Sequence, residues 1–297
     1  MKKFKENLSK DLLQLFLIIS LVMFYSCQNK NYINYYNKVN EIDSVYRFQK
    51  DSLTVIKEYR KLFRKYPPKN QERIQELETF IMLANKHNKS FGGKKTLRKL
   101  VSAMAPYQNA YTQYQDLYSK YKLDSIVVKE DIIKWKSNLN RKLVDSFTVA
   151  FIRDQQDGRS KKNIFIANDK KNAKLLKWTL ENYGFPSINK IGIIGNQDVF
   201  MPMDNLLSHM SQTEYFSFFK EEILKSVRYG ECPPRFYAIM VDRYNLSRKD
   251  MNILYGTYTG SSNEIIDTIT IDKNRRSIGL PSLKHTKQIT KDFFKKK

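Results

Sequence analysis

Histidines and cysteines are few in this chain, and their positions limit the chemistry that it could perform. The three histidines and two cysteines are scattered over 297 residues, without the spacing typical of a zinc cluster. The ten glycines include no GxxxxGKS, GxxxxGKT or GxGxxG motif, which excludes the common phosphate-binding loops. No serine or cysteine lies in a recognisable nucleophile elbow. His209 is a candidate for proton transfer, because imidazole titrates near neutral pH. We expect His87 and His285 at the surface, and neither a cofactor nor a bound metal.

The first 26 residues have the layout of a secretory signal peptide. Four lysines precede an apolar run over residues 12–25, in which only Gln14 and Ser20 are polar. This run of 14 residues is shorter than the ~20 that a membrane-spanning helix needs. Because Cys27 follows closely, the segment resembles a bacterial lipoprotein signal, in which Cys27 would become the lipid-modified first residue of the mature chain. An uncleaved anchor and an ordinary signal peptide are the alternatives, and each of them exports the rest of the chain.

The composition is that of a globular and strongly basic protein. Apolar residues make up 41% of the chain, and 53 lysines and arginines against 30 acidic residues give a formal charge of +23. The basic residues are spread over the whole chain, and export separates it from nucleic acid, so no nucleic-acid partner is expected. The expected location is the cell envelope, on the periplasmic or outer-membrane side. The expected partners are the membrane, through the N-terminal lipid, and an envelope protein or glycan.

The spacing of apolar residues predicts a mainly α fold, with helical hairpins followed by a helical domain and a small C-terminal β-hairpin. A first helix is expected to end at Pro67-Pro68, and an apolar seam rich in tyrosine recurs between Leu97 and Tyr121. The expected organisation is a signal peptide over residues 1–26, a tether over 27–40, a helical N-terminal region over 41–150, a second helical domain with the β-hairpin over 151–286, and a basic tail over 287–297.

Two features of the second domain are specific enough to test. Asp169 is expected to cap a helix that ends at Gly184. Residues 265–271 alternate isoleucine with threonine or aspartate, which predicts a strand. Residues 255–259 are its expected partner strand, and residues 260–263 have the composition of the connecting turn.

Eight short motifs in this second domain resemble, in order, those of a bacterial family of unknown function. Family members read roughly DQxxR, DxxN, YGWP, VG, LLxQH, AYLxDR, QxYGTQ and DxxRxxxGL. The matching residues are Asp154-Gln155 with Arg159, Asp169 with Asn172, residues 183–186, Ile191-Gly192, residues 206–209, Tyr237-Ala238 with Asp242-Arg243, residues 255–257, and Asp272 with Arg275 and Gly279-Leu280. The resemblance covers about residues 150–285. Ser208 and Tyr258 stand where the family has glutamine.

The resemblance places nine polar residues at positions that the family pattern fixes, and two interpretations of them are open. In the first, they share a cleft in which His209 is a general base oriented by Asp242, and Arg243 binds an anion. In the second, they form a buried network in which Arg243 bridges aspartate carboxylates and His209 is a satisfied core residue. The candidate cluster consists of Asp154, Gln155, Arg159, Asp169, Asn172, His209, Asp242, Arg243 and Tyr255.

Two classes of function follow from these observations. The expected one is a membrane-anchored lipoprotein that acts as a non-catalytic binding or interaction protein of the cell envelope. The alternative is an envelope hydrolase or lyase that uses His209 with an acidic partner. Cys232 would be the one cysteine besides Cys27, and we expect it to be a small buried apolar residue rather than a nucleophile.

Overall fold

The computed structural model describes residues 31–69, 71, 73–107, 110–248, 252–258 and 267–295. The chain divides into two compact units, Met1–Asn31 and Tyr32–Lys297. The expected signal peptide and Cys27 lie outside the described residues. The prediction of a mainly α fold is confirmed, because the described part of the second unit consists of helices and connecting turns, with one isolated antiparallel bridge between Ile194 and Phe200. None of the helices in these ranges combines the length and the apolar character needed to cross a bilayer.

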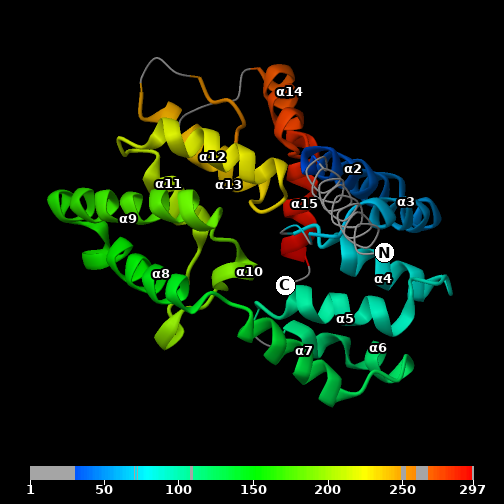
Figure 1. The fold of residues 1–297 in the computed structure, drawn as a ribbon. Coiled ribbons are helices and arrows are strands. Elements are labelled where there is room, and N and C mark those ends of the chain that lie inside the picture. Colours follow the sequence, from blue (N-terminus) through cyan, green and yellow to red (C-terminus); the bar gives the residue numbers. More distant parts are fainter. Residues whose placement is uncertain are drawn as a thin grey trace, which may run out of the picture. The chain divides into compact units, whose positions relative to one another are not determined.

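The first half of the second unit is a series of helices in which neighbours along the chain pack on one another (Figure 1). Helix α3 illustrates the local cause: Asp51 accepts a hydrogen bond from the backbone N–H of Thr54 at its start, and the helix ends before Pro67, as predicted. Its buried face follows the expected helical spacing. The elements are α2 (Tyr32–Ser44), the π-helical turn η1 (Val45–Gln49), α3 (Ser52–Lys65), α4 (Glu76–Lys86), α5 (Gly93–Met104), η2 (Ala110–Tyr114), α6 (Gln115–Lys120) and α7 (Ser125–Ser137).

The expected tether over residues 27–40 is wrong for the part that the structure describes from Tyr32 onward. Helix α2 begins at Tyr32, and its tyrosines are core residues: Tyr35 and Val39 are fully buried. Tyr32, Tyr35 and Tyr36 recur at three- and four-residue spacing, so they line one face of the helix. The polar composition of the segment concealed this face, because tyrosine buries a large ring while its hydroxyl is still able to form hydrogen bonds.

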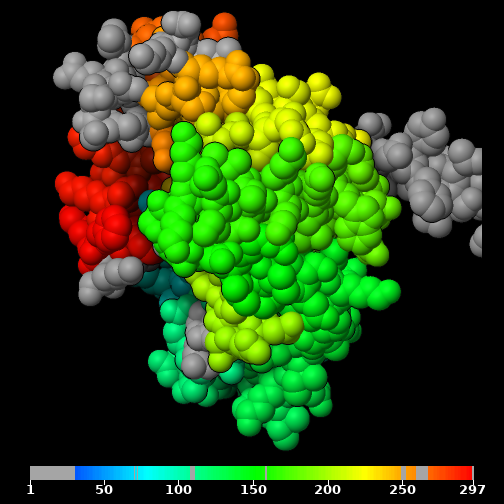
Figure 2. Space-filling view, turned by 90° about the vertical axis from the view of Figure 1, so that its left-hand side faces the viewer, coloured from blue at the N-terminus to red at the C-terminus, as the bar shows by residue number. Residues whose placement is uncertain are grey.

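The second half of this unit follows its first half without a domain boundary at residue 150, because that residue lies inside helix α8. Helix α11 packs on both α9 and α13, and α12 contacts α2 of the first half. In Figure 2 the green surface of α8 and α9 adjoins the yellow surface of the helices that follow. The elements are α8 (Arg141–Asp154), η3 (Gln156–Arg159), α9 (Lys162–Tyr183), α10 (Ile188–Ile191), η4 (Asn196–Asp198), α11 (Met203–Met210), α12 (Phe216–Arg228), α13 (Pro234–Leu246), α14 (Thr268–Ile278) and α15 (Leu283–Lys295).

The β-hairpin expected near the C-terminus is not found in the described residues. Residues 268–271, the end of the expected strand, form the first turn of α14, where Asp267 accepts a hydrogen bond from the N–H of Thr270. Ile271 and Ile278 are seven residues apart and both buried, which is a helical spacing. The expected turn over residues 260–263 lies outside the described residues. Of the expected partner strand, residues 255–258 are bends rather than a strand.

The basic tail expected over residues 287–297 is also wrong within the described range, because α15 extends to Lys295. Ile289 of this helix is buried in the core. His285, expected at the surface, is buried as well, whereas His87 is exposed as predicted. Cys232 is fully buried, which confirms its expected role as an apolar core residue, and burial raises the pKa of its thiol.

Candidate functional site

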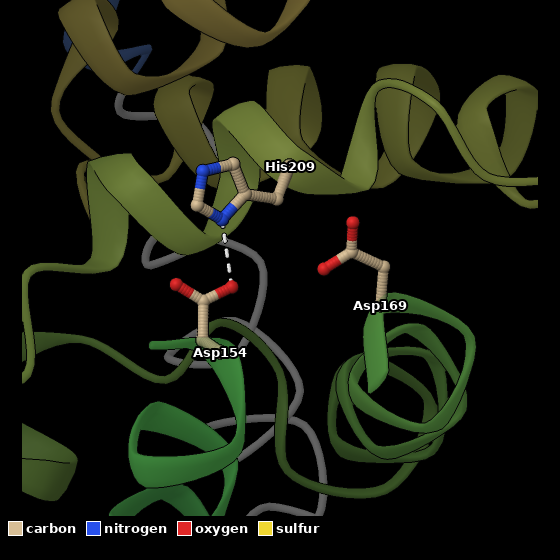
Figure 3. A group of neighbouring side chains, drawn as sticks. All are labelled: Asp154, Asp169 and His209. Atoms are coloured by element: carbon tan, nitrogen blue, oxygen red, sulfur yellow. Dashed lines mark hydrogen bonds and ion pairs between the residues drawn. The ribbon is translucent and has the colours of Figure 1, made fainter. Parts of the chain in front are cut away.

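Three helices bring an imidazole and two carboxylates together (Figure 3). Asp154 is the last residue of α8, Asp169 lies in the middle of α9, and His209 is near the end of α11. Asp169 is therefore not the helix cap that the sequence suggested, because α9 begins seven residues earlier, at Lys162. Asp169 and Asn172 lie on the buried side of α9, facing the end of α8.

Asp154 holds the imidazole of His209. The Nδ1 atom of His209 donates to Asp154 Oδ1 at 2.7 Å, and Gln155 Nε2 donates to Asp154 Oδ2 at 2.6 Å. The Asp154 side chain is completely buried, whereas 12% of the His209 side chain is exposed. With Nδ1 donating to the carboxylate, a neutral imidazole has its lone pair on Nε2, which has no hydrogen-bond partner among the described residues.

Arg159 joins the two carboxylates. Its guanidinium donates to both oxygens of Asp169, at 2.9 and 2.6 Å, and its Nη1 atom also lies 3.1 Å from Asp154 Oδ1. The guanidinium lies 5.0 Å from the centre of the Phe165 ring. Burial alone would lower the pKa of Arg159, but the hydrogen bonds to Asp169 and the charges of both carboxylates raise it above its ordinary value.

These contacts define the α8–α11 quartet, which consists of Asp154, Arg159, Asp169 and His209. Three of its members, the two aspartates and His209, have ligand atoms within 4.8 Å of one another, as in a metal site. The guanidinium of Arg159 already occupies the oxygens that a metal ion would need, so the quartet contains its own cation. The geometry therefore favours a salt-bridged network over a metal centre.

Asp242 belongs to a different cluster, so its expected pairing with His209 is wrong. Asp242 is fully buried, and its carboxylate accepts hydrogen bonds from the N–H groups of Leu254, Tyr255 and Thr257 and from the Thr257 hydroxyl, at 2.7 to 3.0 Å. A carboxylate that accepts four hydrogen bonds from one loop fixes the fold of that loop.

Tyr255 belongs to the same cluster as Asp242. Its ring packs edge-on against Tyr237, and burial raises the pKa of the Tyr255 hydroxyl. Its backbone carbonyl accepts a hydrogen bond of 2.6 Å from Arg275, which is only 2% exposed. Burial lowers the pKa of Arg275 to about 10, although the charges of Asp272 and Asp242 act in the opposite direction and raise it.

Arg243 does not bridge aspartates, as the network interpretation expected. Its Nη1 atom donates to the Ser208 hydroxyl at 2.6 Å, and its guanidinium lies 5.6 Å from the centre of the Tyr258 ring. Ser208 and Tyr258 are two of the positions at which the expected family pattern has glutamine and this chain does not. Arg243 therefore connects α13 to the turn of α11 that carries His209, and Arg159 performs the bridging.

Several residues of the network were missed from the sequence. Arg153 donates to the side-chain oxygen of Asn172 at 2.9 Å, and Asn172 donates to the carbonyl of Ala150 at 3.1 Å. Asn168 donates to the carbonyl of Arg153 and to Gln156. The spacing of Asn168 and Asn172, one helical turn apart beside Asp169, is a signal that could have indicated a polar face on α9.

Another cluster, with the same residue types as the α8–α11 quartet, lies elsewhere in the unit and was not predicted from the sequence. His285 Nε2 donates to Asp43 Oδ2 at 2.7 Å, and Arg47 donates to Asp43 at 2.6 Å and to Asp292 at 2.8 Å. These residues form the α2–α15 quartet, which consists of Asp43, Arg47, His285 and Asp292. It ties the first described helix of the unit to the last.

The chain matches no protein-family model, no curated protein and no solved structure. The resemblance to a bacterial family of unknown function therefore stays a prediction. What the candidate site can do follows from its own geometry: a buried carboxylate orients one imidazole, and all four carboxylate oxygens of the α8–α11 quartet accept hydrogen bonds from within the chain.

Proposed function

We propose that this protein is an exported lipoprotein, anchored to a membrane of the cell envelope through Cys27, and that its helical unit is a non-catalytic binding module. The observation that carries the non-catalytic part is the internal use of the polar groups. Asp154 and Asp169 direct their oxygens to Gln155, Arg159 and His209, so neither carboxylate has a free oxygen for a substrate or a metal.

The α2–α15 quartet supports the same interpretation. It repeats the combination of one histidine, one arginine and two aspartates, and its histidine is only 6% exposed. A buried quartet that joins α2 to α15 has a structural role, because its charges must be paired once they leave water. The same combination in the α8–α11 quartet then needs no catalytic explanation.

A second candidate function is an envelope hydrolase or lyase. One observation favours it: the buried Asp154 carboxylate holds His209 so that the other ring nitrogen is left as a proton acceptor. Within the described residues Ser208 Oγ forms no hydrogen bond with this histidine, and its hydroxyl accepts from Arg243 instead. The reaction would therefore need water or a substrate group as the nucleophile.

The anchor is tested by labelling the full chain in a bacterial host with an alkyne-tagged fatty acid and separating membranes from soluble proteins. The wild-type chain is expected to carry the label and to sediment with membranes, and Cys27→Ser is expected to lose both properties. Cys232→Ser is the matched control, since it alters the chain's other cysteine, and it is expected to keep the label. An unlabelled, soluble wild-type chain would contradict the anchor.

The non-catalytic part is tested by His209→Gln, which preserves a polar side chain of similar size. If the binding interpretation is right, loss of function in the cell will accompany loss of folding stability, measured by urea unfolding. A variant that folds with wild-type stability and yet loses all function in the cell would instead favour the hydrolase or lyase.

A further inference from the structure

Two hollows adjoin helix α5. One, of about 530 Å³, lies between the start of α5 and the turn from α6 to α7, and Lys94, Lys95, Arg98 and Lys122 line it. The other, of about 290 Å³, lies between α3, α4 and α5. Its walls include the aromatic rings of Phe63, Phe80 and Phe91, and Arg60, Arg64 and Lys99 stand around them. The two hollows share one basic helix, which begins with the sequence Gly93-Lys94-Lys95.

Positive charge is in excess around these hollows, because their linings contain seven cations and one acidic residue. Arg60 donates to the carbonyl of Ser90, and Arg98 forms a two-bonded pair with Asp131. The other five cations form no ion pair with the described residues; they are Arg64, Lys94, Lys95, Lys99 and Lys122. The one acidic residue in either lining is Asp124, and its carboxylate accepts from the N–H of Ile126 at the start of α7. We call the four cations that line the larger hollow the α5 basic face, which is suited to an anionic partner; they are Lys94, Lys95, Arg98 and Lys122.

Exposed apolar side chains on α7, the helix that packs on α5, favour a lipid surface over a soluble anion. Ile126 and Ile133 are 63% and 65% exposed, and they lie seven residues apart on one side of α7. Val127, next to Ile126, lines the larger hollow. Exposed isoleucines beside lysines are typical of segments that lie on a bilayer, where apolar side chains enter the lipid and cations bind the headgroups.

We infer that the α5 basic face docks on anionic phospholipid headgroups, with Ile126 and Ile133 entering the edge of the apolar layer. The inference rests on the proposed function, because an anchor would keep the unit at a membrane surface. It adds a specific orientation, with α5 and α7 toward the lipid, and a preference for phosphate-bearing anionic lipids. Each basic residue near an anionic leaflet contributes roughly a fivefold increase in binding, so a face with several unpaired cations amounts to a substantial preference.

The test is amide hydrogen exchange of the full chain with vesicles of phosphatidylcholine, with and without phosphatidylglycerol. Phosphatidylglycerol is expected to slow exchange in α5 and α7, and added salt is expected to reverse the effect. The double variant Lys94→Ala/Lys95→Ala is expected to weaken vesicle binding at least tenfold. The matched control is Lys171→Ala/Lys174→Ala, which removes two exposed lysines of α9 and is expected to change binding less than twofold.

Further measurements distinguish binding to lipid from binding to a soluble anion, and distinguish docking of α5 from the effect of the N-terminal anchor. Ile126→Ser is expected to reduce protection in phosphatidylglycerol vesicles, whereas soluble glycerol phosphate without vesicles is expected to protect neither helix. Equal exchange in both kinds of vesicle would overturn the docking surface, and protection by glycerol phosphate alone would overturn the lipid. Cys27→Ser in the same assay distinguishes failure of the anchor from failure of docking. If only the anchor is lost, the phosphatidylglycerol-dependent protection of α5 and α7 remains. If docking fails, anchored chains show no such protection.

Discussion

The α8–α11 quartet and the α2–α15 quartet are built from the same four residue types in two different surroundings. In each, a fully buried aspartate accepts from a histidine at 2.7 Å, and an arginine connects that aspartate to a second one. The aspartates that hold the histidines, Asp154 and Asp43, have side-chain exposures of 0%. The histidines differ: 12% of His209 is exposed, against 6% of His285. The repetition indicates that this chain uses the combination to join helices that are distant in sequence.

The two quartets also differ in how completely they satisfy their polar atoms. In the α8–α11 quartet both Asp154 oxygens accept hydrogen bonds, one of them from Gln155. In the α2–α15 quartet Asp43 Oδ1 is buried without a partner, and the buried hydroxyl of Tyr59 also lacks one. An unsatisfied buried oxygen costs free energy. The carboxylates of the α8–α11 quartet are thus the better satisfied of the two sets, which is consistent with a structural role.

The largest expected effect comes from removing either central aspartate. Asp154→Ala and Asp43→Ala are each expected to lower the free energy of unfolding by about 3–5 kcal/mol, because an arginine and a histidine lose their buried counter-charge. The measurement is urea unfolding followed by circular dichroism. Exposed Asp116→Ala, on α6, is the control and is expected to change stability by less than about 0.5 kcal/mol. A stable Asp154→Ala beside an unstable Asp43→Ala would break the equivalence of the quartets.

A smaller effect is expected at the histidines. His285→Ala and His209→Ala are each expected to cost about 1–3 kcal/mol of unfolding free energy, since each removes a hydrogen bond to a buried carboxylate. The loss at His285 should be the greater, because His285 is the more buried. If His209→Ala unfolds at the same urea concentration as the wild-type chain, His209 does not support the fold, and the enzyme interpretation gains.

The smallest effect is expected at Tyr59, where the structure predicts a sign. Tyr35 donates to Glu76 at 2.7 Å and accepts from the N–H of Lys69, so Tyr35→Phe should cost about 2 kcal/mol. Tyr59→Phe removes an unpartnered hydroxyl and should leave stability unchanged or raise it by up to about 1 kcal/mol. Thermal unfolding of both variants measures the difference, and equal losses would contradict the assignment of hydrogen bonds.

The same tyrosines predict how stability depends on pH. Burial, followed by the charges of nearby acids, raises the pKa of Tyr59 and of Tyr35 well above the ordinary value of 10.0. Above pH 10 the unfolded chain loses these protons and the folded chain retains them, so the free energy of unfolding falls as pH rises. Tyr59→Phe should lose less stability than the wild-type chain between neutral pH and pH 11, a range accessible to urea titration.

The sequence predicted local structure well where one helix decides it. The spacing of Ile56, Tyr59 and Phe63 and the stop at Pro67-Pro68 correctly indicated α3. The expected helix also included Val45 and Phe48, which lie in η1, before the chain turns at Lys50. Residues 265–271 were misleading, because alternating isoleucines resemble a strand, while the Asp267 cap and the spacing of Ile271 and Ile278 determine a helix. A pattern of period two over seven residues is too short to outweigh a helix cap followed by buried isoleucines one and three turns later.

The candidate site was only partly predictable for a different reason. The resemblance grouped Asp154, Arg159 and Asp169 with His209, and the structure brings these four together. It also grouped Asp242 with them, which the structure places under the loop of residues 254–257. Sequence order does not specify which carboxylate meets which imidazole across 55 residues, because that pairing depends on how α8, α9 and α11 pack.

The central claim is that the α8–α11 quartet is a structural network, and a double-mutant cycle between Asp154 and His209 tests it most directly. Asp154→Asn, His209→Gln and the double variant are compared with the wild-type chain by urea unfolding. A structural network predicts a coupling free energy of about 1.5–3 kcal/mol between the two residues, so the double variant loses less stability than the sum of the single variants. A coupling free energy close to zero, with losses that simply add, would contradict the structural network.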